Sequence, residues 1–270
     1  MGDLLDLQNE IASRLANALG VELTSRDAAR PTEYPDALDY ILRGRAAAWK
    51  PLSRDNYAEA VGQFERQLAL DPRSVEAQTR LADLLAARVL SGTSDSVSAD
   101  LARAEGLVGQ ALAASPRYTL AHFVNGQVLR AQNRWEDAIP EFETALASNR
   151  NMVAALHSLG WCKLYAGSIE QVIPLEEQAI RLSPRDPAVG TRYFLIGTVH
   201  LLQSRTDEAI VWLETARSAI PAVAFLCRRL AAAYALRGET ERAAAELAEA
   251  RRLNGGDLFS SITHVKAGGW

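Results

Sequence analysis

Apolar residues recur along this chain with the period of an α-helix. Between about residue 36 and residue 255 they fall at positions i, i+3, i+4 and i+7, and no stretch alternates between apolar and polar residues as a half-buried strand would. Pro72, Pro116, Pro184 and Pro221 come at the ends of such stretches, and proline cannot continue a helix. The pattern therefore predicts an all-α protein built from short helices separated by turns.

The helical stretches also repeat one another. Trp135, Ala138, Phe142 and Ala145 follow each other at spacings of three, four and three, and five further stretches carry a similar series. Each series is preceded by another predicted helix, marked by a bulky residue and then a small one. These marks are Leu81-Ala82, Asn125-Gly126, Leu159-Gly160, Ile196-Gly197 and Leu230-Ala231. A small residue at this point allows two antiparallel helices to approach closely.

This arrangement, at a period of 34 residues, resembles the tetratricopeptide repeat (TPR) over roughly residues 36–255. The resemblance implies a right-handed α-solenoid of about six helical hairpins, in which stacked neighbours share one core. We expect residues 1–35 to form an N-terminal helix and connector, and residues 256–270 a C-terminal capping helix and tail. The polar run 91–98 predicts a surface loop inserted in the second hairpin, either ordered or disordered.

The N-terminal segment has two interpretations. Leu4, Leu7, Ile11 and Leu15 form one apolar stripe, which could cap the first hairpin or connect it to an upstream domain. Residues 6–19 and 36–45 are similar to the start of the repeat region in bacterial multidomain signalling proteins, whose first domain is a class III adenylate/guanylate cyclase or a winged-helix DNA-binding domain. That resemblance implies a regulatory or oligomerisation domain that lacks its catalytic domain.

Composition narrows the possible partners. The formal net charge is −4 and the pI is about 5.7, which argues against nucleic-acid or anionic-membrane partners. Cys162 and Cys227 lie in apolar helical patterns and are interpreted as buried thiols, which favours a cytoplasmic location. No run of apolar residues is long enough for a membrane span.

No catalytic pattern stands out. There is no phosphate-binding glycine loop, and the four histidines fall on separate predicted helices, so we expect no metal, no cofactor and no enzymatic activity of the chain by itself. Glu176 and Glu177, like other carboxylates of the second helices, are interpreted as solvated surface charge.

The TPR resemblance implies a concave groove lined by the first helix of each hairpin. Transferring the family's groove positions predicts a surface that binds a peptide or a helix of a partner protein. Its residues are Phe123, Gln127, Arg130, His157, Trp161, Leu164, Tyr165, Phe194, Thr198, Leu201 and Arg228. The alternative is that Trp161 and Tyr165 are buried by neighbouring helices. The lysine and asparagine pattern that clamps chaperone tails is not matched. The chain's own upstream domain or a second copy of the chain are the other partners that we consider.

Overall fold

The computed structural model describes residues 54–253, and this part of the chain is helical throughout, with no β-strand. The helices are α3 (Arg54–Leu70), α4 (Val75–Leu90), α5 (Val97–Ala114), α6 (Thr119–Ala131), α7 (Trp135–Ser148), α8 (Val153–Tyr165), the short 3-10 helix η1 (Ile169–Gln171), α9 (Val172–Leu182), α10 (Val189–Leu202), α11 (Thr206–Ala219), α12 (Ala224–Leu236) and α13 (Thr240–Leu253). The predicted terminal helices and the first helix of the first hairpin lie outside the described residues.

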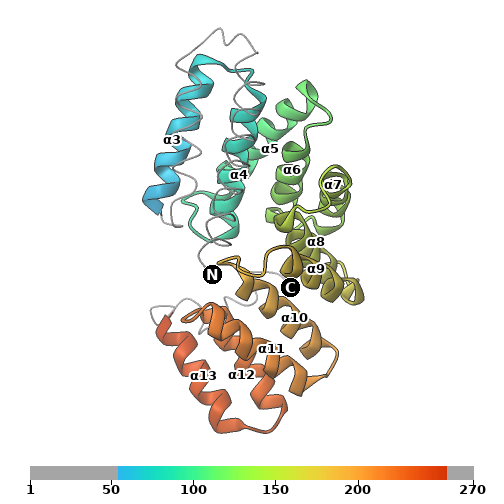
Figure 1. Ribbon diagram of the computed structural model, residues 1–270. Helices are drawn as coiled ribbons and strands as arrows, with labels where there is room; N and C mark the ends of the chain where they lie inside the picture. The colour runs from blue at the N-terminus through green and yellow to red at the C-terminus, as the bar shows by residue number, and fades with distance from the viewer. Residues whose placement is uncertain (1–53, 254–270) are drawn as a thin grey trace, which may run out of the picture.

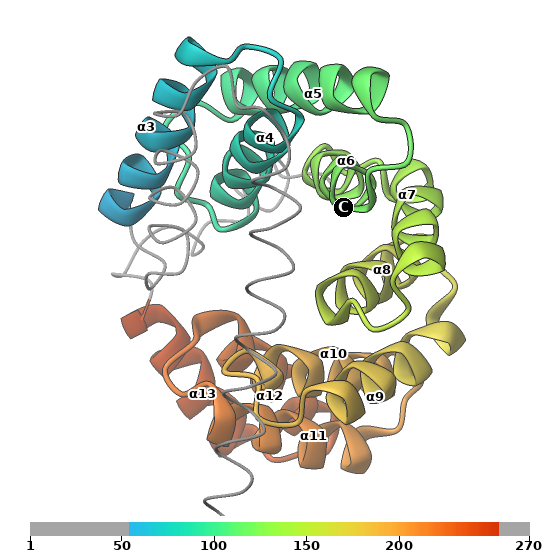
Figure 2. The ribbon, with the colours of Figure 1, turned by 45° about the horizontal axis from the view of Figure 1, so that its top comes forward.

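The helices pair into antiparallel hairpins that stack along the chain. The pairs are α4–α5, α6–α7, α8–α9, α10–α11 and α12–α13, and α3 packs on α4 as the second helix of the first predicted hairpin. Seen along the stack, α4, α6, α8, α10 and α12 lie on the inside of the curve, while α5, α7, α9, α11 and α13 form its outside (Figures 1 and 2). The predicted all-α solenoid is confirmed.

Small residues of the inner helices set the distance between the two helices of a hairpin. A Cβ atom added to Gly126 would lie 2.7 Å from Cε1 of Phe142, and one added to Gly197 would lie 2.8 Å from Cγ of Leu213. Both distances are shorter than van der Waals contact. The small positions of the repeat are therefore a packing requirement, and the large residue opposite each of them fills the space.

The turn between the two helices of a hairpin uses a left-handed backbone conformation. Asn133, Gly167, Ser204 and Gly238 occupy equivalent places and have φ values of 60°, 84°, 59° and 85°. After Asn133, the backbone N–H of the next residue donates to the carbonyl of Leu129 at 2.9 Å, which satisfies one of the last acceptors of α6. Glycine takes this conformation without strain, whereas asparagine and serine do not.

The apolar core is not uniform along the stack. One large cluster of buried residues runs from Tyr57 to Cys162, and another runs from Phe194 to Ala243. Between them lies a small cluster made of Leu164, Val172, Leu195 and Val199. The apolar core is therefore least continuous where α8 and α9 meet α10.

The second hairpin accommodates its extra residues mainly in its helices. The helices α4 and α5 have 16 and 18 residues, against 13 and 14 for α6 and α7. The connecting loop is only residues 91–96, because Val97 and Ser98 already belong to α5. Asp100 of α5 connects the loop to both helices. It accepts a hydrogen bond from Arg88 of α4 and another, at 2.7 Å, from the hydroxyl of Ser94 in the loop. Within residues 54–253, no helix combines the length and the apolar character needed to cross a membrane.

Candidate functional site

The inner face of the solenoid contains a hollow of about 630 Å³, which we call the groove. Its walls come from α6, α8, α10 and α12, with further residues from the end of α4, the start of α7 and the turn before α10. Segments that are distant in sequence thus meet at one surface.

Five aromatic rings follow one another along the groove and form what we call the aromatic ladder. Trp135 stacks on Tyr165 with ring centroids 4.5 Å apart, and Tyr165 stacks on Trp161 at 5.9 Å. Trp161 then contacts Phe194 at 6.1 Å, and Phe194 meets Phe225 edge to face at 4.8 Å. Tyr165 and Phe225 keep 52% and 38% of their surface exposed. The ladder therefore offers apolar ring surface to a ligand.

Hydrogen bonds fix the orientation of the central ring. The indole N–H of Trp161 donates to Nε2 of His157 at 3.2 Å, and Nδ1 of His157 lies 2.9 Å from Oε2 of Glu176. Because an indole nitrogen can only donate, Nε2 is the acceptor, and the neutral imidazole carries its proton on Nδ1 and donates it to the carboxylate. Trp161 is therefore held through His157 by a residue of α9.

The expectation that Glu176 is solvated surface charge is wrong. Its side chain is completely buried, and burial raises the pKa of its carboxyl group against the opposing effects of His157 and Arg192. Glu176 stands 34 residues after Phe142, and His157 stands 34 residues after Phe123. In the α6–α7 hairpin those two phenylalanines pack ring against ring, 5.9 Å apart. The next hairpin replaces this apolar pair with a hydrogen-bonded polar one. Glu177, in contrast, is exposed.

The structure separates the predicted groove residues into two sets. Six of them line the groove, namely Gln127, Arg130, His157, Trp161, Tyr165 and Phe194. Phe123, Leu164 and Thr198 are instead buried in the core. Their positions face the second helix or the neighbouring hairpin, as the contact of Phe123 with Phe142 shows. Leu201 packs against the core of the last two hairpins, and Arg228 is exposed on α12 but does not line the groove.

Two rungs of the ladder were not predicted. Phe225 stands six residues before the small residue of its hairpin, as Ala154 does in α8 and Thr191 does in α10, and all three line the groove. Applying the family's groove positions to α12 as well would therefore have predicted Phe225. Trp135 begins an outer helix and was interpreted only as a mark of the repeat. Its ring reaches the groove by stacking on Tyr165.

Two arginines bring positive charge to the groove in different ways. Arg192 is 4% exposed and donates through Nη2 to Oδ2 of Asp186 at 2.7 Å. Arg130 is also largely covered, and burial lowers the pKa of its guanidinium group. Its Nε is buried with no hydrogen-bond partner, and no carboxylate of residues 54–253 pairs with it. Among the described residues, no cluster of histidine, cysteine and acidic side chains is arranged to hold a metal ion.

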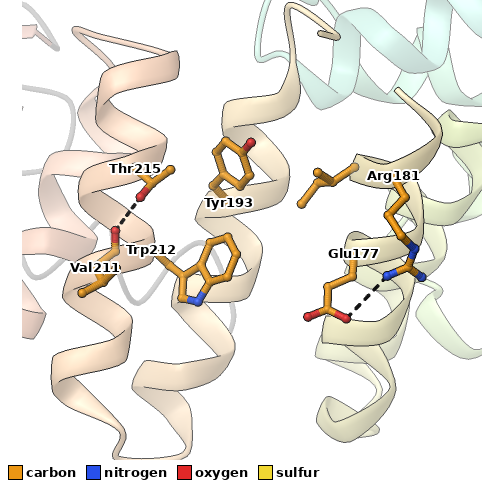
Figure 3. A pocket seen from close by; sticks show the side chains of 7 residues that line it. Glu177, Arg181, Tyr193, Val211, Trp212 and Thr215 are labelled. Atoms are coloured by element: carbon orange, nitrogen blue, oxygen red, sulfur yellow. Dashed lines mark hydrogen bonds and ion pairs between the residues drawn. The ribbon is translucent and has the colours of Figure 1, made fainter. Parts of the chain in front are cut away.

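A second hollow, of about 460 Å³, lies on the outer side between α9 and α11 (Figure 3). Tyr193 and Trp212 contact each other in it with ring centroids 5.7 Å apart, and Glu177 and Arg181 form an ion pair of 3.9 Å at its edge. It has two rings where the groove has five, and no arginine in it is buried without a partner. The groove is therefore the stronger candidate for a binding site, and the outer hollow provides control residues.

Comparison with known proteins agrees with the fold. The tetratricopeptide repeat family model matches residues 92–152 and 123–187. No curated protein matches the chain in sequence. Among solved structures, PilW, titled a widely conserved type IV pilus biogenesis factor, is similar with a TM-score of 0.64 and 14% identity, over 87% of this chain and 100% of PilW.

Two further structures have the same fold. PilF of Pseudomonas aeruginosa gives a TM-score of 0.61 at 17% identity, over 86% of this chain and 96% of PilF. YrrB, titled a TPR protein with an unusual peptide-binding site, gives 0.50 at 18% identity, over 76% of this chain and 97% of YrrB. These comparisons match the repeats and give no support to a cyclase-associated region. Residues 92–187 thus match the tetratricopeptide repeat in sequence, and the chain has the solenoid fold of these structures.

Proposed function

We propose that the chain is a scaffold that binds a short peptide segment of a partner protein in the groove. TPR proteins bind protein or peptide partners. The observation that carries the proposal for this chain is the aromatic ladder, because Tyr165 remains half exposed although it stacks between two tryptophans. Rigid aromatic side chains of this kind are enriched among the residues that dominate binding energies.

The size of the groove favours a few extended residues over a partner helix. An α-helix with its side chains is about 10–12 Å across, so 10 Å of helix occupies roughly 900 Å³. The groove holds about 630 Å³, which is less than two helical turns. A peptide that lays two or three apolar side chains on the ladder fits this volume.

A random 12-residue peptide library displayed on phage tests the proposal. Peptides enriched on the full chain are synthesised and their dissociation constants are measured against variants by fluorescence anisotropy. Tyr165→Ala should weaken binding by about tenfold or more, as truncation of a central aromatic contact does. Trp212→Ala, in the outer hollow, is the matched control and should change affinity by less than twofold. The proposal is refuted if no peptide is enriched, or if the enriched peptides respond to Trp212→Ala and not to Tyr165→Ala.

A further inference from the structure

One charged side chain of the groove has no counter-charge among residues 54–253. Arg130 lies in the last turn of α6, lines the groove, and makes no ion pair with a carboxylate of residues 54–253. Most other covered cations of the described chain are neutralised. Arg192 pairs with Asp186, Arg88 with Asp100 and Lys163 with Glu143. A guanidinium group that leaves water without a counter-charge destabilises the fold. Its position in the groove indicates that the missing anion belongs to the ligand.

The side chains around Arg130 indicate which groups a ligand carries next to its anion. Burial lowers the pKa of Arg130, and the two neighbouring groups that act against this are the buried thiol of Cys162 and the phenol of Tyr165, which belongs to the ladder. Gln127 lies one turn before Arg130 on α6, also lines the groove, and has a buried Oε1 that accepts no hydrogen bond. The groove therefore places an unpaired cation and an unused amide acceptor next to exposed ring surface.

The charge balance of the groove favours a single negative charge. Arg192 is compensated by Asp186, whereas Arg130 carries one positive charge that no carboxylate of residues 54–253 pairs with. A carboxylate carries one negative charge and accepts two parallel hydrogen bonds from one guanidinium group. A phosphate ester carries nearly two charges and would require a second uncompensated cation. The ligand chemistry that fits is a carboxylate.

We infer that Arg130 recognises a carboxylate of the bound peptide, next to an aromatic or large apolar residue that packs on Tyr165. The carboxylate can come from an aspartate or glutamate side chain or from the end of a peptide. In either case the free oxygen of Gln127 can accept a backbone N–H of the same segment. This inference rests on the proposed function and adds the acidic residue as the determinant of specificity.

The test uses two phage-displayed libraries of random 12-residue peptides, one complete and one without aspartate and glutamate. The full chain should enrich peptides with an acidic residue beside an aromatic one, and the library without acidic residues should yield binders at least tenfold weaker. For an enriched peptide, replacing its acidic residue with the amide should weaken binding by about tenfold to a hundredfold, because hydrogen bonds to charged groups are the strong ones.

Variants of the chain then locate the effect at Arg130. Arg130→Gln should remove most of the difference between the acidic peptide and its amide, Arg130→Lys should retain part of it, and Arg181→Gln on the outer side should leave it unchanged. Because Arg130 is a covered cation with no carboxylate partner in residues 54–253, Arg130→Gln should unfold at an equal or higher temperature, so loss of binding cannot be attributed to misfolding.

The possible outcomes separate the two proposals. If amidating the peptide's C-terminus weakens binding while the side-chain replacement does not, the carboxylate is the terminal one and the inference holds. If binding depends on Tyr165 but is indifferent to the peptide's carboxylates and to Arg130→Gln, the carboxylate inference is overturned and the peptide-binding groove stands. If binding does not depend on Tyr165, the proposed function itself fails.

Discussion

The replacement of two phenylalanines by His157 and Glu176 allows a quantitative prediction. The variants are His157→Phe, Glu176→Phe and the double variant, which restores the pair that Phe123 and Phe142 form in the preceding hairpin. The two side chains of the polar pair are 18% and 0% exposed. His157→Phe leaves the Glu176 carboxyl group buried without its donor, which we expect to cost about 3–5 kcal/mol.

The other single variant should cost less. Glu176→Phe leaves Nδ1–H of His157 unpaired, but that side chain is within reach of water, so we expect a loss of about 1–3 kcal/mol. In the double variant neither side chain of the pair leaves the other without a partner, and only the indole N–H of the partly exposed Trp161 loses its acceptor. An apolar pair of similar volume is neutral or stabilising by about 1–4 kcal/mol. The two substitutions should therefore be strongly non-additive, with a coupling energy above about 3 kcal/mol.

Urea unfolding followed by far-ultraviolet circular dichroism measures all four free energies of unfolding. The control is the cycle of His122→Ala and Glu141→Ala, whose pair has a similar geometry (2.7 Å) but is 20% and 25% exposed. Its coupling should stay below about 1 kcal/mol, as for other exposed pairs. Two results would contradict this reasoning: a coupling energy at His157 and Glu176 no larger than that of the control, or a double variant less stable than both single variants. Either would show that the polar pair does not simply take the place of two packed phenylalanines.

Three further predictions concern stability and reactivity. Because burial raises the pKa of Glu176 in the native state, the native chain binds its proton more tightly than the unfolded chain. The stability from this proton is complete below about pH 4.3, the ordinary glutamate value, and is lost as the pH rises through the raised native pKa. The unfolding free energy of wild type minus that of Glu176→Gln should therefore fall over this range, and a flat or rising difference contradicts the pKa direction. Cys162 and Cys227 are both buried, and burial raises the pKa of each thiol, that of Cys162 to about 11. Iodoacetamide at pH 8 should label neither thiol in the native chain and both in guanidinium chloride, and rapid native labelling of Cys162 would be inconsistent with its packing. Ser204 has a φ of 59°, so Ser204→Gly should stabilise the chain by about 0.5–1 kcal/mol. The control Ser218→Gly, within α11, should destabilise the chain by a similar amount. If Ser204→Gly is destabilising too, the turn at Ser204 is not strained.

The repeat could be predicted from the sequence because packing imposes it. Gly126 and Gly197 are small since a larger residue would collide with the outer helix, and this requirement recurs at a fixed spacing. The same regularity revealed which inner-helix positions could line the groove. It did not predict that Phe123 would be buried, because a groove position and a core position differ only by a modest rotation of the helix.

Other features of the site depend on contacts between repeats. Trp135 reaches the groove by stacking on a residue 30 positions later, and no periodicity within α7 indicates this. The burial of Glu176 did leave a signal, since it interrupts the column of apolar residues formed by Phe142 and Leu213. We interpreted the interruption as surface charge, because a carboxyl group in a core is uncommon unless it has a partner. Its partner, His157, lies on another helix and was interpreted as a groove residue.

The small apolar cluster that joins α8 and α9 to α10 has a consequence for how the molecule unfolds. In a solenoid each hairpin contacts little beyond its neighbours, so a weak member in the middle can separate the array into two cooperative units. We expect α4–α8 and α10–α13, whose residues form the two large apolar clusters, to retain amide protons longer than α9 does in hydrogen exchange. The groove spans this boundary, since Trp161 and Tyr165 come from α8 and Phe194 comes from α10. A ligand bound there would contact both units. It should therefore slow hydrogen exchange at their boundary and make the whole array unfold as one unit.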